Sequence, residues 1–264
     1  MEPNERPEIP QEIIIRVRNT KKIDFRKPYR FIRDQWWFTL ISLPVYLLCY
    51  LIALLCSVFF YGLKVVDRRK VRKIMRSRGC IVISNHCHYF DTVYASFILF
   101  PKRLNISVVQ RNLEVPYWRN LLRLLYCFPI PDSPSGLKMI TDSVGRVLKK
   151  KQHVLFLPEG NMVPLSQTIY RFKDGAFYLA YWHQAPIIPI VYVLKRRRIL
   201  GREMPEGWVK MICVFGDPVQ PPSLRENMET PREELKQLSD QLASWMENTI
   251  RSYQAKFAVK TGKH

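Results

Sequence analysis

A run of 26 residues without a charged side chain, 38–63, limits the possible folds of this chain more than any other feature. A helix of about 20 apolar residues is long enough to cross the hydrocarbon core of a bilayer. The flanks argue against a simple crossing, because residues 1–37 hold nine Lys and Arg and residues 64–80 hold eight. Basic flanks tend to stay on the cytoplasmic side, and one span cannot keep both of them there. Pro44, near the start of the run, also favours a bend.

We therefore expect residues 38–63 to form a helical hairpin embedded in one leaflet, with Trp36, Trp37 and Tyr61 at the membrane interface. A single transmembrane span is the main alternative, and a buried helix pair in a soluble protein is a third. The preceding residues, 1–37, are rich in charged residues and proline, and we interpret them as a mobile basic arm, or at most a short surface segment, without a cleavable signal peptide.

The formal net charge of the 264-residue chain, +20 at pH 7, indicates an anionic partner. Nucleic acid, an acidic membrane surface and an acidic carrier protein each fit this charge. A nucleic-acid-binding protein is thus one alternative function, although the apolar run and the lack of a recognisable binding module argue against it. The six cysteines show neither Cys-x-x-Cys pairs nor zinc-ligand spacing, so we expect free, buried thiols.

Beyond residue 80, short apolar runs alternate with segments of helical period. The expected strands are 80–84, 106–110, 127–130, 154–157, 187–193 and 209–215. The expected helices are 91–100, 116–126, 135–151, 175–183 and 231–253. This alternation predicts an α/β fold with a mixed, largely parallel sheet flanked by helices, preceded by the membrane-embedded helical segment.

We assign the α/β domain to residues 64–255 and a frayed basic tail to residues 256–264. Pro186 and Pro189 open and interrupt one expected strand, 187–193. Because proline cannot donate a ladder hydrogen bond, we expect this strand to be short or at an edge of the sheet.

The stretch 81–92, Ile-Val-Ile-Ser-Asn-His-Cys-His-Tyr-Phe-Asp-Thr, carries the strongest chemical signal. Within one helix the side chains of His86 and Asp91 would point about 140° apart, and within one strand they would lie on opposite faces. They can meet if a loop separates a strand from a helix that begins near Asp91. An imidazole oriented by a carboxylate can take a proton from a hydroxyl at neutral pH. A solvated loop with two unconnected histidines explains this stretch alone equally well.

A metal site is a second alternative for the same stretch, because His86, Cys87, His88 and Asp91 are good ligand types. No second cluster in the sequence supplies the remaining ligands, so we expect no metal. We interpret His88 as structural or solvent-facing, and His153 and His183 as structural.

Three later motifs favour the catalytic interpretation of the His–Asp pair. In order with Asn85-His86 and Asp91, the chain contains Pro158-Glu159-Gly160, Phe172-Lys173-x-Gly175-Ala176 and Pro186-Ile-Ile-Pro189. Together these motifs resemble those of the lysophosphatidic acid and glycerophosphate acyltransferase family, over roughly residues 78–220. The resemblance implies a membrane-bound enzyme that moves a fatty acyl group from acyl-CoA or acyl-carrier protein to a hydroxyl of a lysolipid. The acceptor would be 1-acyl-glycerol-3-phosphate or a related lysolipid, the product phosphatidic acid or a related diacyl lipid, and no further cofactor is implied.

The resemblance also implies roles for individual residues. His86 would be the general base, and Asp91 would orient its imidazole and support the imidazolium. Substrate contacts are expected from six residues: Asn85, Glu159, Gly160, Arg111, Arg171 and Lys173. The partners would be membrane lipids and the thioester donor rather than nucleic acid, and the active site would face the cytoplasm. The oligomeric state is left open.

The resemblance is incomplete where the phosphate of the acceptor is expected to bind. The Glu-Gly pair of the family usually continues with Thr-Arg, whereas Asn161 and Met162 follow here. A second family motif commonly ends in arginine, and here it ends at Ser133. Residues 163–170 lengthen the third motif. The acyl-transfer chemistry therefore carries over, while the acceptor could also be an aminolipid or a glycolipid. A non-catalytic lipid-binding member of the fold is a further alternative.

Overall fold

The chain is organised around a seven-stranded β-sheet, seen here in a computed structural model. The structure describes residues 6–10, 22–25, 27–116, 118–131, 134–199, 202–205, 207–226 and 229–261. The strands of the sheet are β1 (Lys64–Val66), β2 (Ile81–Ser84), β3 (Leu104–Val109), β4 (Cys127–Ile130), β5 (His153–Phe156), β6 (Ile187–Arg196) and β9 (Val209–Phe215). A separate ribbon is formed by β7 (Arg198–Ile199) and β8 (Arg202–Glu203).

The order of the strands is β1-β9-β6-β2-β5-β3-β4. Every neighbouring pair is parallel except β6 and β9, which run antiparallel. The predicted mixed and largely parallel sheet is thus confirmed. Its central strands are continuous apolar runs because helices cover both faces.

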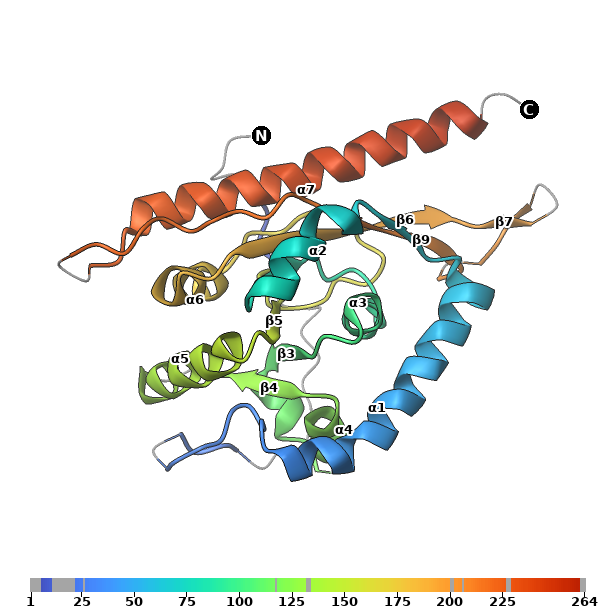
Figure 1. Ribbon diagram of the computed structural model, residues 1–264. Helices are drawn as coiled ribbons and strands as arrows, with labels where there is room; N and C mark the ends of the chain where they lie inside the picture. The colour runs from blue at the N-terminus through green and yellow to red at the C-terminus, as the bar shows by residue number, and fades with distance from the viewer. Residues whose placement is uncertain are drawn as a thin grey trace.

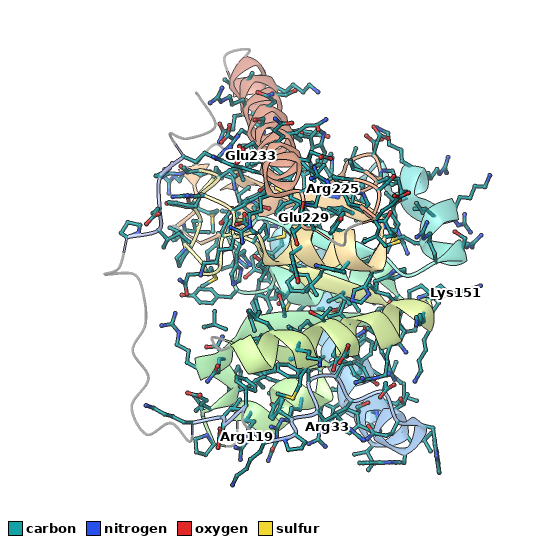
Figure 2. The ribbon with its side chains drawn as sticks, turned by 90° about the vertical axis from the view of Figure 1, so that its left-hand side faces the viewer. Arg33, Arg119, Lys151, Arg225, Glu229 and Glu233 are labelled. Atoms are coloured by element: carbon teal, nitrogen blue, oxygen red, sulfur yellow. The ribbon has the colours of Figure 1, made fainter. Side chains whose placement is uncertain are left out.

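Helices cover the two faces of the sheet as separate layers (Figure 1). The helices of the described residues are α1 (Trp36–Cys56), the π-helix η3 (Ser57–Tyr61), α2 (Arg68–Ser77), α3 (Asp91–Leu99), the 3₁₀-helix η4 (Gln110–Leu113), α4 (Trp118–Leu124), α5 (Pro134–Lys149), α6 (Gly175–His183) and α7 (Arg232–Thr261). On one face α5, α6 and α7 bury side chains such as Val144, Phe177 and Leu242. Figure 2 views this layer, with α5 and α6 in front and α7 above them. On the other face α2 and α3 bury Val71 and Ile98.

The expectation that residues 187–193 form a short or edge strand is wrong. β6 has ten residues and lies between β2 and β9. Pro189 is tolerated because it pairs with Ile83 on one side and, on the other, lies opposite Gly216, just beyond the end of β9. The carbonyl of Pro189 accepts the N–H of Gly216 at 2.9 Å, so the missing proline N–H costs the sheet one bond at the end of a ladder.

The expected helical hairpin over residues 38–63 is also wrong, because α1 continues directly into η3 as one helix. Pro44 lies inside α1 without ending it. The first glycine of the run is Gly62, where the backbone turns with φ +49°. Within the described residues, Trp36–Tyr61 is the one helix long and apolar enough to cross a membrane, and only 11% of its most apolar stretch is buried.

The described parts of the N-terminal segment pack on the domain, contrary to the expectation of a mobile arm. Arg6 is buried and forms ion pairs with Asp240 and Glu247 of α7, at 3.0 and 2.8 Å. Phe25 and Phe31 are buried in the core. At the other end, α7 continues to Thr261, so residues 256–261 are helical rather than a frayed tail. The rest of that tail lies outside the described residues.

Candidate active site

The candidate catalytic residues lie at the carboxyl edge of three adjacent parallel strands. His86 follows β2, Glu159 follows β5, and Arg111 follows β3. In open α/β sheets this edge is where ligand-binding groups gather. The strand order β2-β5-β3 therefore brings together motifs that are far apart in the sequence.

His86 and Asp91 form a hydrogen-bonded pair, as their spacing predicted. The Nδ1 atom of His86 lies 2.8 Å from Oδ2 of Asp91, with the two side chains 21% and 0% exposed. Asp91 is the first residue of α3, and its carboxylate also accepts the backbone N–H groups of His88 (3.3 Å) and Thr92 (2.6 Å). The partial positive charge at a helix N-terminus stabilises a carboxylate placed there. Because Nδ1 is held by Asp91, Nε2 of the partly exposed imidazole is the atom that can take a proton from a substrate.

Glu159 is buried beside the backbone of the loop that carries His86. The side chain is 5% exposed, and Oε1 has no hydrogen-bond partner among the described residues. Burial raises the pKa of Glu159 to about 8, opposed by hydrogen bonds from the backbone of His86 and of Tyr170, while the nearby charge of Asp91 also raises the pKa. Glu159 thus holds the loop that carries His86, and its carboxyl group is substantially protonated near neutral pH.

Two residues of the turn after Glu159 each lie next to a cation. Gly160 adopts φ +84°, and a Cβ atom there would lie 2.7 Å from the Lys173 ammonium, so this position requires glycine. On the next residue, Oδ1 of Asn161 accepts a 2.7 Å hydrogen bond from Arg111. Lys173 and Arg111 thus both contact the Gly160–Asn161 turn. The arginines of the family are replaced by Met162, which is partly buried, and by Ser133, which lies outside the described residues.

Asn85 is a structural residue, which corrects its expected role in substrate binding. The side chain is 2% exposed. Oδ1 accepts the N–H of Tyr192 at 2.8 Å, and Nδ2 donates to the carbonyl of the same residue at 3.1 Å. Asn85 therefore fastens the end of β2 to β6 and has no exposed surface to offer a ligand.

Tyr192 is a residue of the site that the sequence did not reveal. It is fully buried in β6, and its hydroxyl donates to the backbone carbonyl of Asp91 at 2.9 Å. Tyr192 thereby supports both ends of the His–Asp loop, through Asn85 and through Asp91. No spacing or residue pattern distinguishes this tyrosine from an ordinary core residue of a strand.

Arg171 lies away from the candidate active site, contrary to its expected role in substrate binding. Its guanidinium is 3.2 Å from the carboxylate of Glu8, and the side chain is 70% exposed. It lines a groove of about 1120 Å³ between α5, α6 and α7, whose lining includes neither His86 nor Asp91. Its neighbour Lys173 is therefore the cation of this motif that reaches the candidate site.

Residues 163–170, which lengthen the third motif, pack beside His86. The N–H groups of Val163 and Leu165 donate to the carbonyls of His86 (3.3 Å) and Cys87 (2.7 Å). The side-chain amide of Gln167 bonds to the backbone of β6, accepting the N–H of Leu194 at 2.8 Å. From the other direction, the ring of Tyr61 at the end of η3 lies 4.8 Å from that of His88. The end of the apolar helix thus contacts the loop that holds the His–Asp pair.

The remaining histidines have structural partners. Nδ1 of His88 accepts the N–H of Phe90 at 3.2 Å, and burial lowers the pKa of His88. His153 is buried and bonded to the N–H of Cys80, and His183 is bonded to the carbonyl of Thr141. The six cysteines are free thiols; four of them are buried, whereas Cys49 and Cys56 are partly exposed. Within the described ranges, no group of three or more His, Cys, Asp and Glu side chains could hold a metal ion.

Comparison with known proteins gives consistent results. The model of the family described as Acyltransferase matches residues 62–193. The chain is 29% identical over 137 residues to human 1-acyl-sn-glycerol-3-phosphate acyltransferase beta, a match that spans 51% of this chain and 48% of that protein. It is 25% identical over 239 residues to the 1-acyl-sn-glycerol-3-phosphate acyltransferase of Pseudomonas aeruginosa, spanning 86% of this chain and 80% of that one.

Among solved structures, the chain resembles the crystal structure of the 1-acyl-sn-glycerophosphate (LPA) acyltransferase PlsC from Thermotoga maritima. The TM-score is 0.56 at 15% sequence identity, and the match covers 85% of each chain. At this identity the likeness shows a shared fold. The match to the human relative spans about half of that protein's length.

Proposed function

The chain belongs to the acyltransferase family, and we propose that it transfers a fatty acyl group from a thioester to the free hydroxyl of a lysolipid at a membrane surface. The observation that carries this proposal is the His86–Asp91 pair, bonded at 2.8 Å within the segment that matches the family. An imidazole placed this way can activate a hydroxyl group, which is the nucleophile that acyl transfer to a lysolipid requires.

The proposed reaction needs one base and one leaving group. Nε2 of His86 takes the hydroxyl proton as the hydroxyl oxygen attacks the thioester carbonyl, while the Asp91 carboxylate stabilises the imidazolium. The tetrahedral intermediate collapses, the C–S bond breaks, and the thiolate takes the proton back from His86. The donor is acyl-CoA or acyl-carrier protein, since both carry the same thioester.

The cations beside the site favour an acceptor with an anionic headgroup. Arg111 donates to Asn161, and the ammonium of Lys173 lies close to Gly160, although the arginine positions of the family are altered. Arginine and lysine are the usual ligands of phosphate in proteins. Our first candidate is therefore 1-acyl-glycerol-3-phosphate, the acceptor named for the relatives, ahead of an aminolipid or a glycolipid.

The geometry of α1 supports attachment to one leaflet without a crossing. One side of the helix packs on the domain along its length, through Ser42 on Tyr126 (2.5 Å), Tyr50 on Phe97 and the Tyr61–His88 contact. A helix crossing the bilayer would pull α3 and α4 into the hydrocarbon. A helix lying in the plane of the interface keeps both basic flanks on the cytoplasmic side, together with the active site.

A panel of donors and acceptors tests the proposed function. The purified full-length chain, in vesicles, is offered labelled acyl-CoA or acyl-carrier protein together with lysolipids that differ in headgroup. We expect transfer to 1-acyl-glycerol-3-phosphate, and weaker transfer to lysolipids whose headgroup is neutral. Absence of transfer to every acceptor would contradict the proposal. Lysolipid binding without transfer would instead support the non-catalytic alternative.

A further inference from the structure

An aromatic patch joins the end of the apolar helix to the turn that connects β6 and β9. Three consecutive residues of η3 project into solvent: Val58, Phe59 and Phe60 are 62%, 67% and 49% exposed. Trp208, at the base of the β6–β9 hairpin, is 42% exposed, and its ring lies 6.1 Å from that of Phe60. In Figure 1 the β7 end of this hairpin lies next to the C-terminal end of α1.

Arg197 holds the two parts of this patch together. Its Nη1 donates to the backbone carbonyls of Phe59 (3.2 Å) and Phe60 (2.7 Å), at the last turn of η3. These carbonyls have no helical partner, and a cation there is also favoured by the helix dipole. The backbone N–H of Arg197 in turn donates to the carbonyl of Trp208 at 3.1 Å. The hairpin is thus fixed to the helix at a defined place.

We propose that the base of the β6–β9 hairpin, around Arg197 and Trp208, is a second membrane-contact element that docks on anionic headgroups beside α1. This inference rests on the proposed membrane location of the chain. Exposed Trp rings are typical of the membrane interface, and Phe is typical of the apolar face of helices that lie in it. The patch continues the exposed apolar row of α1, which includes Leu51, Ile52 and Leu55.

The charge of the hairpin specifies the kind of membrane. Residues 195–204 hold five Lys and Arg and one Glu. Of these, Arg197 lies in the patch, whereas the ammonium of Lys195 lies over the ring of Phe257 in α7. Basic side chains next to apolar anchors are attracted by anionic lipids and not by neutral ones. An anionic leaflet therefore fits this surface better than a neutral leaflet or a protein groove.

Two attachment points have a consequence that one helix alone lacks. A single helix in the interface leaves the domain free to rotate about the helix axis, whereas a second contact to one side of the axis prevents this rotation. Tyr61 lies between the patch and the catalytic loop, in contact with His88. Docking of the hairpin would therefore hold the His86 edge of the sheet at a fixed height above the bilayer, where lysolipid headgroups lie.

Fluorescence quenching by brominated lipid tests the location of the hairpin directly. The full-length chain is reconstituted in vesicles of phosphatidylcholine and phosphatidylglycerol, with and without dibrominated phosphatidylcholine. Trp208→Phe removes one reporter, Trp36→Phe removes a reporter on α1, and Trp182→Phe removes one on the opposite layer, in α6. The measured quantity is the fluorescence lost when brominated lipid is present. We expect this loss to be smaller in W208F and in W36F than in the wild type, and unchanged in W182F.

Three outcomes would overturn the inference. If W36F lowers the fluorescence loss and W208F does not, only α1 reaches the lipid. If neither substitution lowers it, the membrane location fails as well. If Trp208 is shielded both from brominated lipid and from aqueous acrylamide, a second copy of the chain covers the patch instead of a membrane.

A second variant tests the effect on turnover and keeps the inference separate from the proposed reaction. With lysolipid embedded in anionic vesicles, we expect Trp208→Ser to lower acyl transfer about fivefold, which corresponds to roughly 1 kcal/mol. In detergent micelles, where no extended surface orients the protein, we expect wild-type transfer. An equal effect in both settings would contradict an orienting role. If the chain transfers no acyl group at all, the quenching result still decides the location of the hairpin.

Discussion

Glu159 is a buried carboxyl group whose protonation state links the stability of the fold to pH. Its folded-state pKa of about 8 lies above the ordinary value of 4.5, mainly because of burial. The native state therefore binds this proton more tightly than the unfolded chain does, and the stabilisation is complete below about pH 4.5 and is lost as pH rises towards 8.

We expect Glu159→Gln to remove this pH dependence, because glutamine stays neutral. The free energy of unfolding of the wild type should fall relative to that of E159Q between about pH 5 and 8, by at most on the order of 4 kcal/mol. Chemical denaturation of both proteins at several pH values measures the difference. Parallel curves for the two proteins would show that Glu159 titrates normally in the folded state.

The residues of the candidate active site show which contacts could be predicted from the sequence. The pairing of His86 with Asp91 could be predicted, because their spacing excludes one regular element and requires a strand, a loop and a helix start. The burial of Asn85 and the hydroxyl contact of Tyr192 could not, since both depend on β6, about a hundred residues later in the chain. The contact between Arg111 and Asn161 likewise exists only because β3 and β5 are neighbours in the sheet.

At the scale of elements, the side chain of Asn85 acts as a clamp between β2 and β6. Removing it leaves the N–H and carbonyl of Tyr192 without this partner in a buried place, and each such loss costs about 1–3 kcal/mol. We expect Asn85→Ala to destabilise the fold by about 2–4 kcal/mol in chemical denaturation. Asn112→Ala is the matched control, because Asn112 is exposed and its loss should cost less than about 0.5 kcal/mol. Equal stability of the two variants would rule out the clamp.

The helices and strands that were not predicted from the sequence were missed for physical reasons. The strand β1 and the helix α2 follow the apolar run, and six of the ten residues of α2 are Lys or Arg. Only Val71 and Met75 of this helix are buried, so its apolar residues are too few to predict a helix from their spacing. Pro186 and Pro189 misled in the opposite direction, because Pro186 precedes β6 and Pro189 lies where its missing N–H costs the sheet little. Where periodicity was strong, as in α5 and β9, the predicted ranges agree with the structure within two residues.

At the scale of the molecule, the exposed face of α1 is an apolar surface on a chain that is otherwise strongly basic. We expect two charges on this face, Leu47→Glu with Leu51→Glu, to release the protein from membranes, because a carboxylate near lipid costs about 2–3 kcal/mol. Both leucines are half exposed and pack little on the domain. Flotation of vesicles in high salt measures the bound fraction.

Leu224→Glu is the control for this experiment, since Leu224 is 47% exposed and lies outside α1. We expect this variant to float with the vesicles as the wild type does. Release of the wild type itself by high salt would show that charge, rather than α1, attaches the protein to the membrane. The sequence predicted a membrane-embedded segment at α1, but it did not predict that this segment is one helix packed on the domain. Length and composition alone do not show which side of a helix packs on a domain.

The central claim is that His86, oriented by Asp91, removes the proton of the acceptor hydroxyl. The most direct measurement compares initial rates of acyl transfer by the wild type, His86→Gln and Asp91→Asn, with labelled thioester and 1-acyl-glycerol-3-phosphate in vesicles. A general base contributes about 10²–10⁴ to the rate, so we expect losses of this size in H86Q and in D91N, with folding and vesicle binding unchanged. A folded H86Q that transfers acyl groups at the wild-type rate would contradict the account.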